Sequence, residues 1–172
     1  KRQVHANGFS LVRKIIEVSK TDLATTVDRM AEPLGTMLMQ PTRIYHKAAR
    51  AARMAGGVTG VCHVTGGGLV ENPPRVYGED LALELDCSSW SLPPLFEWLA
   101  KAGNIAPLEL ARTFNCGIGM LLFVDEGCAD ECLAALQQGP ESDAWIAGRL
   151  VEREQGSASV SFDGLDAWPS PA

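Results

Sequence analysis

Two spacings of apolar residues alternate along this chain of 172 residues. From Phe9 to Lys20 apolar side chains recur every three or four positions, which predicts a helix with one buried face, and Asn7 in front of it can cap the helix. The alanine-rich stretch from Ile44 to Ala55 predicts a second helix, which Thr42 can cap and Gly56-Gly57 ends.

Shorter helices and strands follow one another through the rest of the chain. Helices are predicted for residues 69–77 with a break at Pro73-Pro74, and for 95–102, 107–113 and 129–136. Strands are predicted for residues 59–64, 81–86, 120–124, 144–151 and 157–162, a loop for 21–33, and a short apolar segment for 34–39. Because strands alternate with helices, we expect a layered α/β (α+β) fold, a mixed sheet flanked by helices.

The composition indicates one globular domain, which we place at residues 1–165, followed by a loose tail over 166–172. Of the residues, 46% are hydrophobic and 21% charged, and no linker or repeat interrupts the chain. No stretch approaches the roughly 20 apolar residues of a membrane span, and the N-terminus lacks the apolar core of a signal peptide. The five cysteines are odd in number and form no Cys-x-x-Cys motif, which favours reduced thiols in the cytoplasm.

The net charge of −6 is unevenly distributed. Residues 1–55 hold ten Lys/Arg and four Asp/Glu, a balance of +6, whereas residues 56–172 hold five and seventeen, a balance of −12. The acidic majority argues against nucleic acid as a partner. The basic third suits an anionic small molecule or an acidic partner surface, or consists of solvated helix faces.

The most informative motif is Cys62-His63-Val64-Thr65-Gly66-Gly67-Gly68, in which a strand ends in a histidine and three glycines. Glycines let a backbone approach a ligand closely, and N–H groups in such a turn bind anions, usually phosphate. An imidazole beside the turn can transfer protons near neutral pH. The alternative is a tight turn with a core histidine, since the motif fits neither the Walker nor the dinucleotide pattern.

Three other segments are candidates for binding. His5-Ala6-Asn7-Gly8 precedes a helix whose free N–H groups, with Asn7, would hold a ligand oxygen; simple capping is the alternative. Arg43 and Arg75 follow proline-containing turns and suit phosphate or carboxylate, or serve as structural ion-pair partners. The loop from Asn115 to Gly119 is a second glycine-spaced turn, or a close backbone crossing.

The cysteines carry no predicted chemistry. Cys116 has no base next to it in the sequence, so we do not assign it as a nucleophile. Cys128 and Cys132 lie on one helix face with no histidine or third cysteine beside them, so we expect no metal site.

Taken together, these segments resemble the aminoimidazole ribonucleotide synthetase family (phosphoribosylformylglycinamidine cyclo-ligases). The resemblance runs in order over residues 4–152 and covers only the C-terminal domain of that family. It is carried by residues 5–14, 41–45, 63–69 with Glu71, Asn72 and Arg75, 112–120, and 143–145 with Gly148.

The resemblance implies a layered α/β domain with a partial ferredoxin-like arrangement. It also implies ATP-dependent ring closure of formylglycinamidine ribonucleotide in a cytoplasmic homodimer, with ATP and Mg²⁺ mostly held by the family's N-terminal domain, which is absent here. The isolated chain is therefore expected to be inactive, with neither nucleic acid nor membrane as a partner.

The resemblance also implies residue roles. His63 and His5 match the two active-site histidines, and His63 is the expected acid/base. Asn7, Gly8, Thr65, Gly66, Gly67, Gly68 and Asn72 would line the phosphate and substrate groove, with Arg43, Arg75 and Asn115 as further contacts. Ala6 stands where the family usually has serine, which removes a hydroxyl donor, and Pro73 stands where isoleucine or leucine is usual.

Two other functions stay open at this point. The first is a binding or interaction module that kept the fold without turnover. The second is a sister kinase or synthetase of the same superfamily, against which residues 114–120 and 143–145 argue.

Overall fold

The strands of this computed structural model, which describes residues 4, 7–27 and 29–171, form two small sheets. In the first, β1 (Val58–His63) pairs antiparallel with β3 (Met120–Val124), and His63 lies opposite Met120. In the second, β2 (Leu81–Asp86) lies between β4 (Gly148–Glu152) and β5 (Val160–Asp163). The β2–β4 pair is antiparallel and the β2–β5 pair parallel, so the second sheet is mixed as expected.

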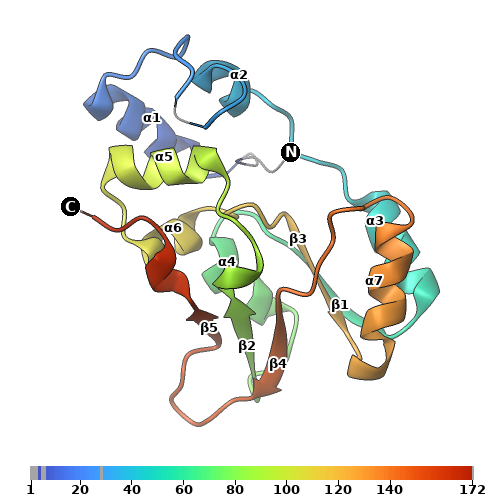
Figure 1. Cartoon of the computed structure of the whole chain (residues 1–172). Coiled ribbons are helices and arrows are strands. Elements are labelled where there is room, and N and C mark those ends of the chain that lie inside the picture. The colour runs from blue at the N-terminus through green and yellow to red at the C-terminus, as the bar shows by residue number, and fades with distance from the viewer. Residues whose placement is uncertain (1–3, 5–6, 28, 172) are drawn as a thin grey trace.

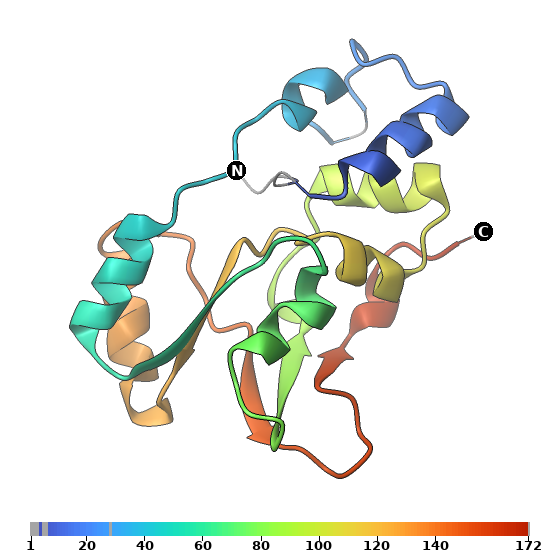
Figure 2. The same ribbon diagram turned by 180° about the vertical axis from the view of Figure 1, so that it is seen from behind.

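The longer helices pack in pairs. Helix α1 (Phe9–Ser19) packs on α5 (Pro94–Gly103), and α3 (His46–Ala55) packs on α7 (Ala129–Gln137). Figures 1 and 2 show α3 and α7 together at one end of the molecule, separated by the β1–β3 ribbon from α1 and α5. Two short helices, α4 (Gly68–Glu71) and α6 (Pro107–Thr113), lie against each other, and α2 (Leu34–Leu38) follows the first loop.

Short 3₁₀ turns complete the chain between these elements. They are η1 (Pro73–Arg75), η2 (Cys87–Ser89), η3 (Glu126–Cys128) and η4 (Leu165–Ala167). The break predicted at Pro73-Pro74 is the boundary between α4 and η1, because proline lacks the N–H that would continue the helix.

Two hydrophobic cores hold these elements together. The larger core buries the inner faces of α1, α5 and α6 and includes Phe96 and Phe114, whose ring centroids lie 6.0 Å apart. The smaller core lies between α3 and α7 and is built from Ala48, Ala52, Cys132 and Leu136. Strand β1 connects them, because Val58 packs on the smaller core and Cys62 belongs to the larger one.

Most predicted elements are confirmed, but both predicted helix caps are wrong. Gly8, at φ 77°, occupies the cap position of α1, and no side chain of the described residues caps that helix. Helix α3 begins at His46 with Tyr45 before it, so Thr42 lies outside the helix it was expected to cap.

The last two strands are shorter than predicted because their partners and neighbours limit them. Strand β4 begins at Gly148 rather than 144, since β2 ends at Asp86 and its final amide donates to Ala147 O. Strand β5 begins at Val160 rather than 157, since Ser157 forms a turn with Glu154 through both its amide and its hydroxyl.

The C-terminal segment differs from the expected loose tail at Trp168. This indole is 6% exposed and packs edge-to-face on Trp90, with ring centroids 5.7 Å apart. Its large apolar area binds the segment after η4 to the main core. Among the described residues, no helix has the length and apolar character to cross a membrane.

Candidate functional site

The triple-glycine turn directly connects β1 to α4. The turn starts where the Val64 amide donates to Gly119 O, and the Gly68 amide closes it by donating to Thr65 O at 3.0 Å. Gly67 and Gly68 have φ angles of 99° and 55°, a region that side chains disfavour. A Cβ on Gly68 would overlap the carbonyl oxygen of Ala111 in α6, so the turn requires glycine there.

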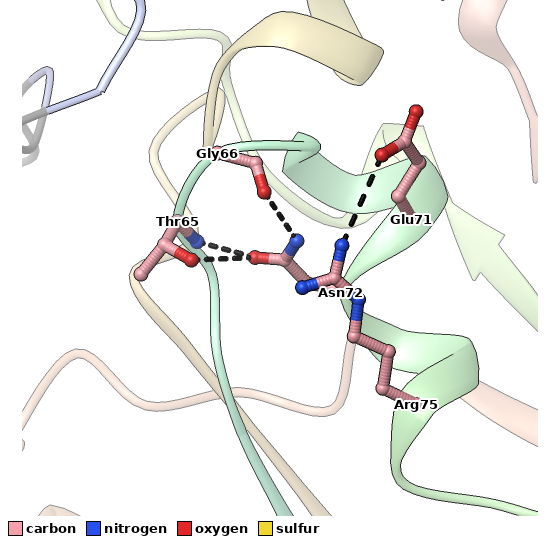
Figure 3. Close-up of polar contacts among 5 residues, drawn as sticks. All are labelled: Thr65, Gly66, Glu71, Asn72 and Arg75. Atoms are coloured by element: carbon pink, nitrogen blue, oxygen red, sulfur yellow. Dashed lines mark hydrogen bonds and ion pairs between the residues drawn. The ribbon is translucent and has the colours of Figure 1, made fainter.

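The side chain of Asn72 holds this turn from within (Figure 3). Its Oδ1 accepts from the Thr65 amide at 2.5 Å and from the Thr65 hydroxyl at 3.1 Å, and its Nδ2 donates to Gly66 O at 2.7 Å. Asn72 is only 4% exposed. The structure therefore gives Asn72 a position that shapes the turn, whereas the sequence placed it in the ligand groove.

These contacts distinguish the four N–H groups of the turn. The amides of Thr65 and Gly68 are used internally, whereas those of Gly66 and Gly67 have no acceptor within the described part of the chain. Gly66 is exposed and Gly67 half-buried. Gly66 and Gly67 are therefore the amides that can meet an anion.

Removal of the Asn72 side chain should lower the free energy of unfolding by about 2–4 kcal/mol, because it removes three hydrogen bonds to Thr65 and Gly66, each worth about 1 kcal/mol. Urea unfolding of Asn72→Ala measures this loss. Thr65→Val is the matched control, since it removes only the hydroxyl bond and should cost about 1 kcal/mol. Equal losses in the two variants would contradict the assigned role of Asn72.

His63 is exposed at the last position of β1, next to the turn. Its imidazole contacts the ring of Tyr45 edge-to-face, with centroids 5.9 Å apart. The alternative of a core histidine is therefore wrong, and His63 is accessible to a ligand. His5, the second predicted histidine, lies outside the described residues.

Three predicted segments converge beside the turn. Asn7, Thr65 and Asn115 line one small hollow that is too narrow for a water molecule, together with Val4, Val64 and Phe114. The Oδ1 atom of Asn7 would lie 3.4 Å from a Cβ built on Gly66, so this amide reaches the turn. Gly8 has no room for a side chain, because a Cβ there would overlap the ring of Phe114.

The two predicted arginines form ion pairs. Arg75 lies 3.9 Å from Glu71, and both side chains are largely exposed (Figure 3). Arg43 lies 2.7 Å from Glu141 and 6.0 Å from the centroid of Tyr45. Burial raises the pKa of Glu141, and the charge of Arg43 opposes that rise. Arg43 thus forms the kind of structural ion pair that was the alternative to ligand binding. Arg75 remains exposed near the turn.

The second glycine-spaced loop, Asn115 to Gly119, is buried. Cys116 has a φ of 47°, and its carbonyl accepts the indole N–H of Trp90 at 3.1 Å. Asn115 is 5% exposed and reaches the small hollow from this loop. The loop therefore supports the turn, since its Gly119 also accepts the amide that starts it.

A family model described as "AIR synthase related protein, C-terminal domain" matches residues 2–161. The chain belongs to this family. The match includes every predicted site residue from His5 to Asn115 and confirms both the resemblance and the fold class.

Three curated relatives are 42–47% identical to this family member over the aligned residues. It is 47% identical over 157 residues to a phosphoribosylformylglycinamidine cyclo-ligase from Burkholderia cenocepacia, which is 91% of this chain and 44% of that protein. It is 43% identical over 159 residues to the protein of the same name from Aromatoleum aromaticum, with 91% and 45% covered. The chicken (Gallus gallus) trifunctional purine biosynthetic protein adenosine-3 is 42% identical over 163 residues, with 94% and 16% covered. The chain thus spans less than half the length of the cyclo-ligases it matches.

The described part of this AIR synthase-related domain contains no group of three His, Cys, Asp or Glu residues that could hold a metal ion. A larger open hollow of about 410 Å³, which the sequence did not indicate, is lined by Ser88, Ser89, Trp90, Ser91, Asp143 and Trp145. None of these residues lines the small hollow beside the turn.

All five cysteines of the AIR synthase-related domain lie in the described part of the chain, and four are buried while Cys128 is partly exposed. Burial raises the pKa of Cys62 to about 11 and that of Cys87 to about 12, and it raises that of Cys116 well above the usual value. Thiols near the turn are therefore protonated at neutral pH and are poor nucleophiles.

Thiol titration at pH 8 should detect about one reactive cysteine, Cys128, in the folded chain and five after denaturation.

Urea unfolding should show a loss of stability between pH 9 and 11. The unfolded thiols ionise first, so each buried thiol costs roughly 1.4 kcal/mol per pH unit in that window. Cys62→Ala should make the loss smaller, and an unchanged stability up to pH 11 would contradict this expectation.

Proposed function

We propose that this chain is the C-terminal part of an ATP-dependent cyclo-ligase that closes the imidazole ring of formylglycinamidine ribonucleotide. The observation that carries the proposal is the convergence of Asn7, Thr65 and Asn115 beside an exposed histidine and a glycine turn. It is supported by the names of relatives that share 42–47% identity with this chain.

The proposed reaction needs positioning, charge neutralisation and proton transfer more than covalent help. ATP supplies the phosphoryl group that activates the formyl-amide oxygen of the substrate as a phosphorylated imidate. The substrate's own nitrogen then attacks that carbon, the C–N bond closes the ring, and the C–O bond to phosphate breaks to release inorganic phosphate. The cyclising nitrogen loses a proton in the process, so the site needs a base.

In this chain, His63 is the proposed proton-transfer group, because its imidazole is exposed at the end of β1. The amides of Gly66 and Gly67 are the proposed anion donors, with Arg75 as the nearby cation. Asn7 and Asn115 are proposed to contact the substrate from the two flanking loops. His5 is proposed as the second active-site histidine by resemblance alone.

ATP and Mg²⁺ are proposed to bind mainly to the N-terminal domain of the family, by resemblance alone. The homodimer and the cytoplasmic location also belong to this proposal. The five free thiols are consistent with a reducing compartment.

The test is an assay of ATP-dependent ring closure that follows both imidazole product and phosphate release. This chain is measured alone, mixed with the N-terminal region of the Burkholderia cenocepacia relative, and fused to that region in one polypeptide. We expect turnover only in the mixture or the fusion. A fusion that folds and binds the substrate without turnover would overturn the proposal and favour a binding module.

A further inference from the structure

We propose that Tyr45 is a positioning residue that sets the orientation of the His63 imidazole, and that Arg43 acts through Tyr45 rather than on a phosphate. This inference rests on the proposed role of His63 in proton transfer. It follows from a chain of side-chain contacts that connects the loop after α7 to the end of β1.

Strand pairing fixes the backbone of His63 but does not by itself set the orientation of its side chain. Strand pairing places His63 opposite Met120, and the next amide, that of Val64, bonds to Gly119 O. A strand position allows an imidazole several staggered side-chain conformations, so the contacts of the ring select among them. Proton transfer requires one of them, because the acceptor nitrogen must point at the reacting atom.

Tyr45 supplies a fixed wall for that ring. It is half-buried, and its backbone is anchored at the start of α3, where its carbonyl accepts the amide of Ala49 at 2.9 Å. Its ring meets the imidazole at an interplanar angle of 60°, the edge-to-face geometry that aromatic pairs prefer. A residue outside the glycine turn therefore restricts the histidine inside the site.

Arg43 and Glu141 in turn hold Tyr45. The guanidinium of Arg43 lies 6.0 Å from the Tyr45 ring centroid and 2.7 Å from the Glu141 carboxylate. The side chain of Glu141 is 15% exposed, so the ion pair is partly shielded from water. As long as Arg43 keeps this partner, its charge is directed at Glu141 and the tyrosine ring rather than at a ligand.

The first measurement is the NMR spectrum of the His63 ring in this chain, compared among wild type, Tyr45→Phe and Tyr45→Leu. The phenyl ring of Tyr45→Phe keeps the ring-current shift of the His63 protons, whereas Tyr45→Leu removes it and broadens the distribution of imidazole orientations. The ring signals of His46, exposed on α3, serve as the internal control. Unchanged His63 signals in Tyr45→Leu would overturn the inference.

The second measurement separates kcat from KM in the fusion described above. We expect Tyr45→Leu and Arg43→Met to lower kcat by about 2- to 10-fold with KM for the substrate unchanged, and Tyr45→Phe to stay close to wild type. Arg53→Met, an exposed arginine on α3, is the matched control. If Arg43→Met instead raises KM at constant kcat, Arg43 binds the ligand and its part of the inference is wrong.

The two measurements also keep this inference apart from the proposed function. If Tyr45→Leu loses the ring-current shift but His63→Ala keeps full activity, the contact between Tyr45 and His63 is confirmed. His63 then takes no part in the reaction, and the proposed function loses its proton-transfer group. Activity that depends on His63 but is unaffected by Tyr45→Leu would leave the proposed function intact and overturn the positioning role.

Discussion

Replacement of Gly68 with alanine should lower the free energy of unfolding by more than about 3 kcal/mol, a large share of the 5–15 kcal/mol typical of a domain. The added Cβ would overlap the carbonyl oxygen of Ala111 and lie 2.7 Å from that of Phe114. Both atoms belong to backbone and cannot rotate away. The φ of 55° adds a smaller cost, since side chains are disfavoured there. Thermal unfolding should show a midpoint lower by about 10 °C.

Gly156→Ala is the matched control for this result. Gly156 also has a positive φ, 85°, but a Cβ built there meets no atom within 4 Å. It should therefore cost only the backbone conformational term, roughly 1–2 kcal/mol. Equal destabilisation by the two substitutions would show that α4 and α6 can separate, and would contradict the close packing assigned to the turn.

Substitution of His63 by alanine should lower kcat by about 10²- to 10⁴-fold in the assembled enzyme, the range for a lost general acid or base. This corresponds to about 3–5 kcal/mol of transition-state stabilisation. The unfolding temperature should stay within about 1 °C, because the exposed imidazole contributes little to either core. Steady-state kinetics and a thermal melt of the same preparation measure both quantities.

His46→Ala is the control, because His46 is exposed and lies one residue beyond Tyr45 at the start of α3. It should retain full activity. Were both variants equally impaired, the loss would reflect damage to α3 rather than the chemistry of His63. Unchanged turnover in His63→Ala would exclude that residue from proton transfer.

Local signals in the sequence predicted most elements of the fold. Apolar periodicity placed α1 and α5 within one residue of their ends, and prolines placed the break after α4. The incorrect predictions lie where contacts between residues distant in the sequence determine the structure. Strand β4 begins late because its partner β2 ends, and Trp168 is held by Trp90, a contact that no local pattern contains.

In the candidate site, too, local motifs could be predicted from the sequence and long-range contacts could not. The turn and the two flanking loops could be predicted, because glycine, asparagine and histidine in those motifs have recognisable chemistry. The roles of individual side chains could not. The bonds of Asn72 inside the turn and the contact of Tyr45 with His63 depend on how the chain folds back on itself. The prediction for His5 remains one, since that residue is not described.

The internal bonds of Asn72 have a consequence for ligand affinity. A flexible glycine-rich turn loses conformational entropy when it wraps an anion, and that loss is subtracted from the binding free energy. Here the Thr65 amide and the Gly66 carbonyl are already fixed by one buried amide side chain before any anion arrives. The conformational entropy of these groups is therefore lost during folding, and the turn is preorganised for the anion that we propose it binds.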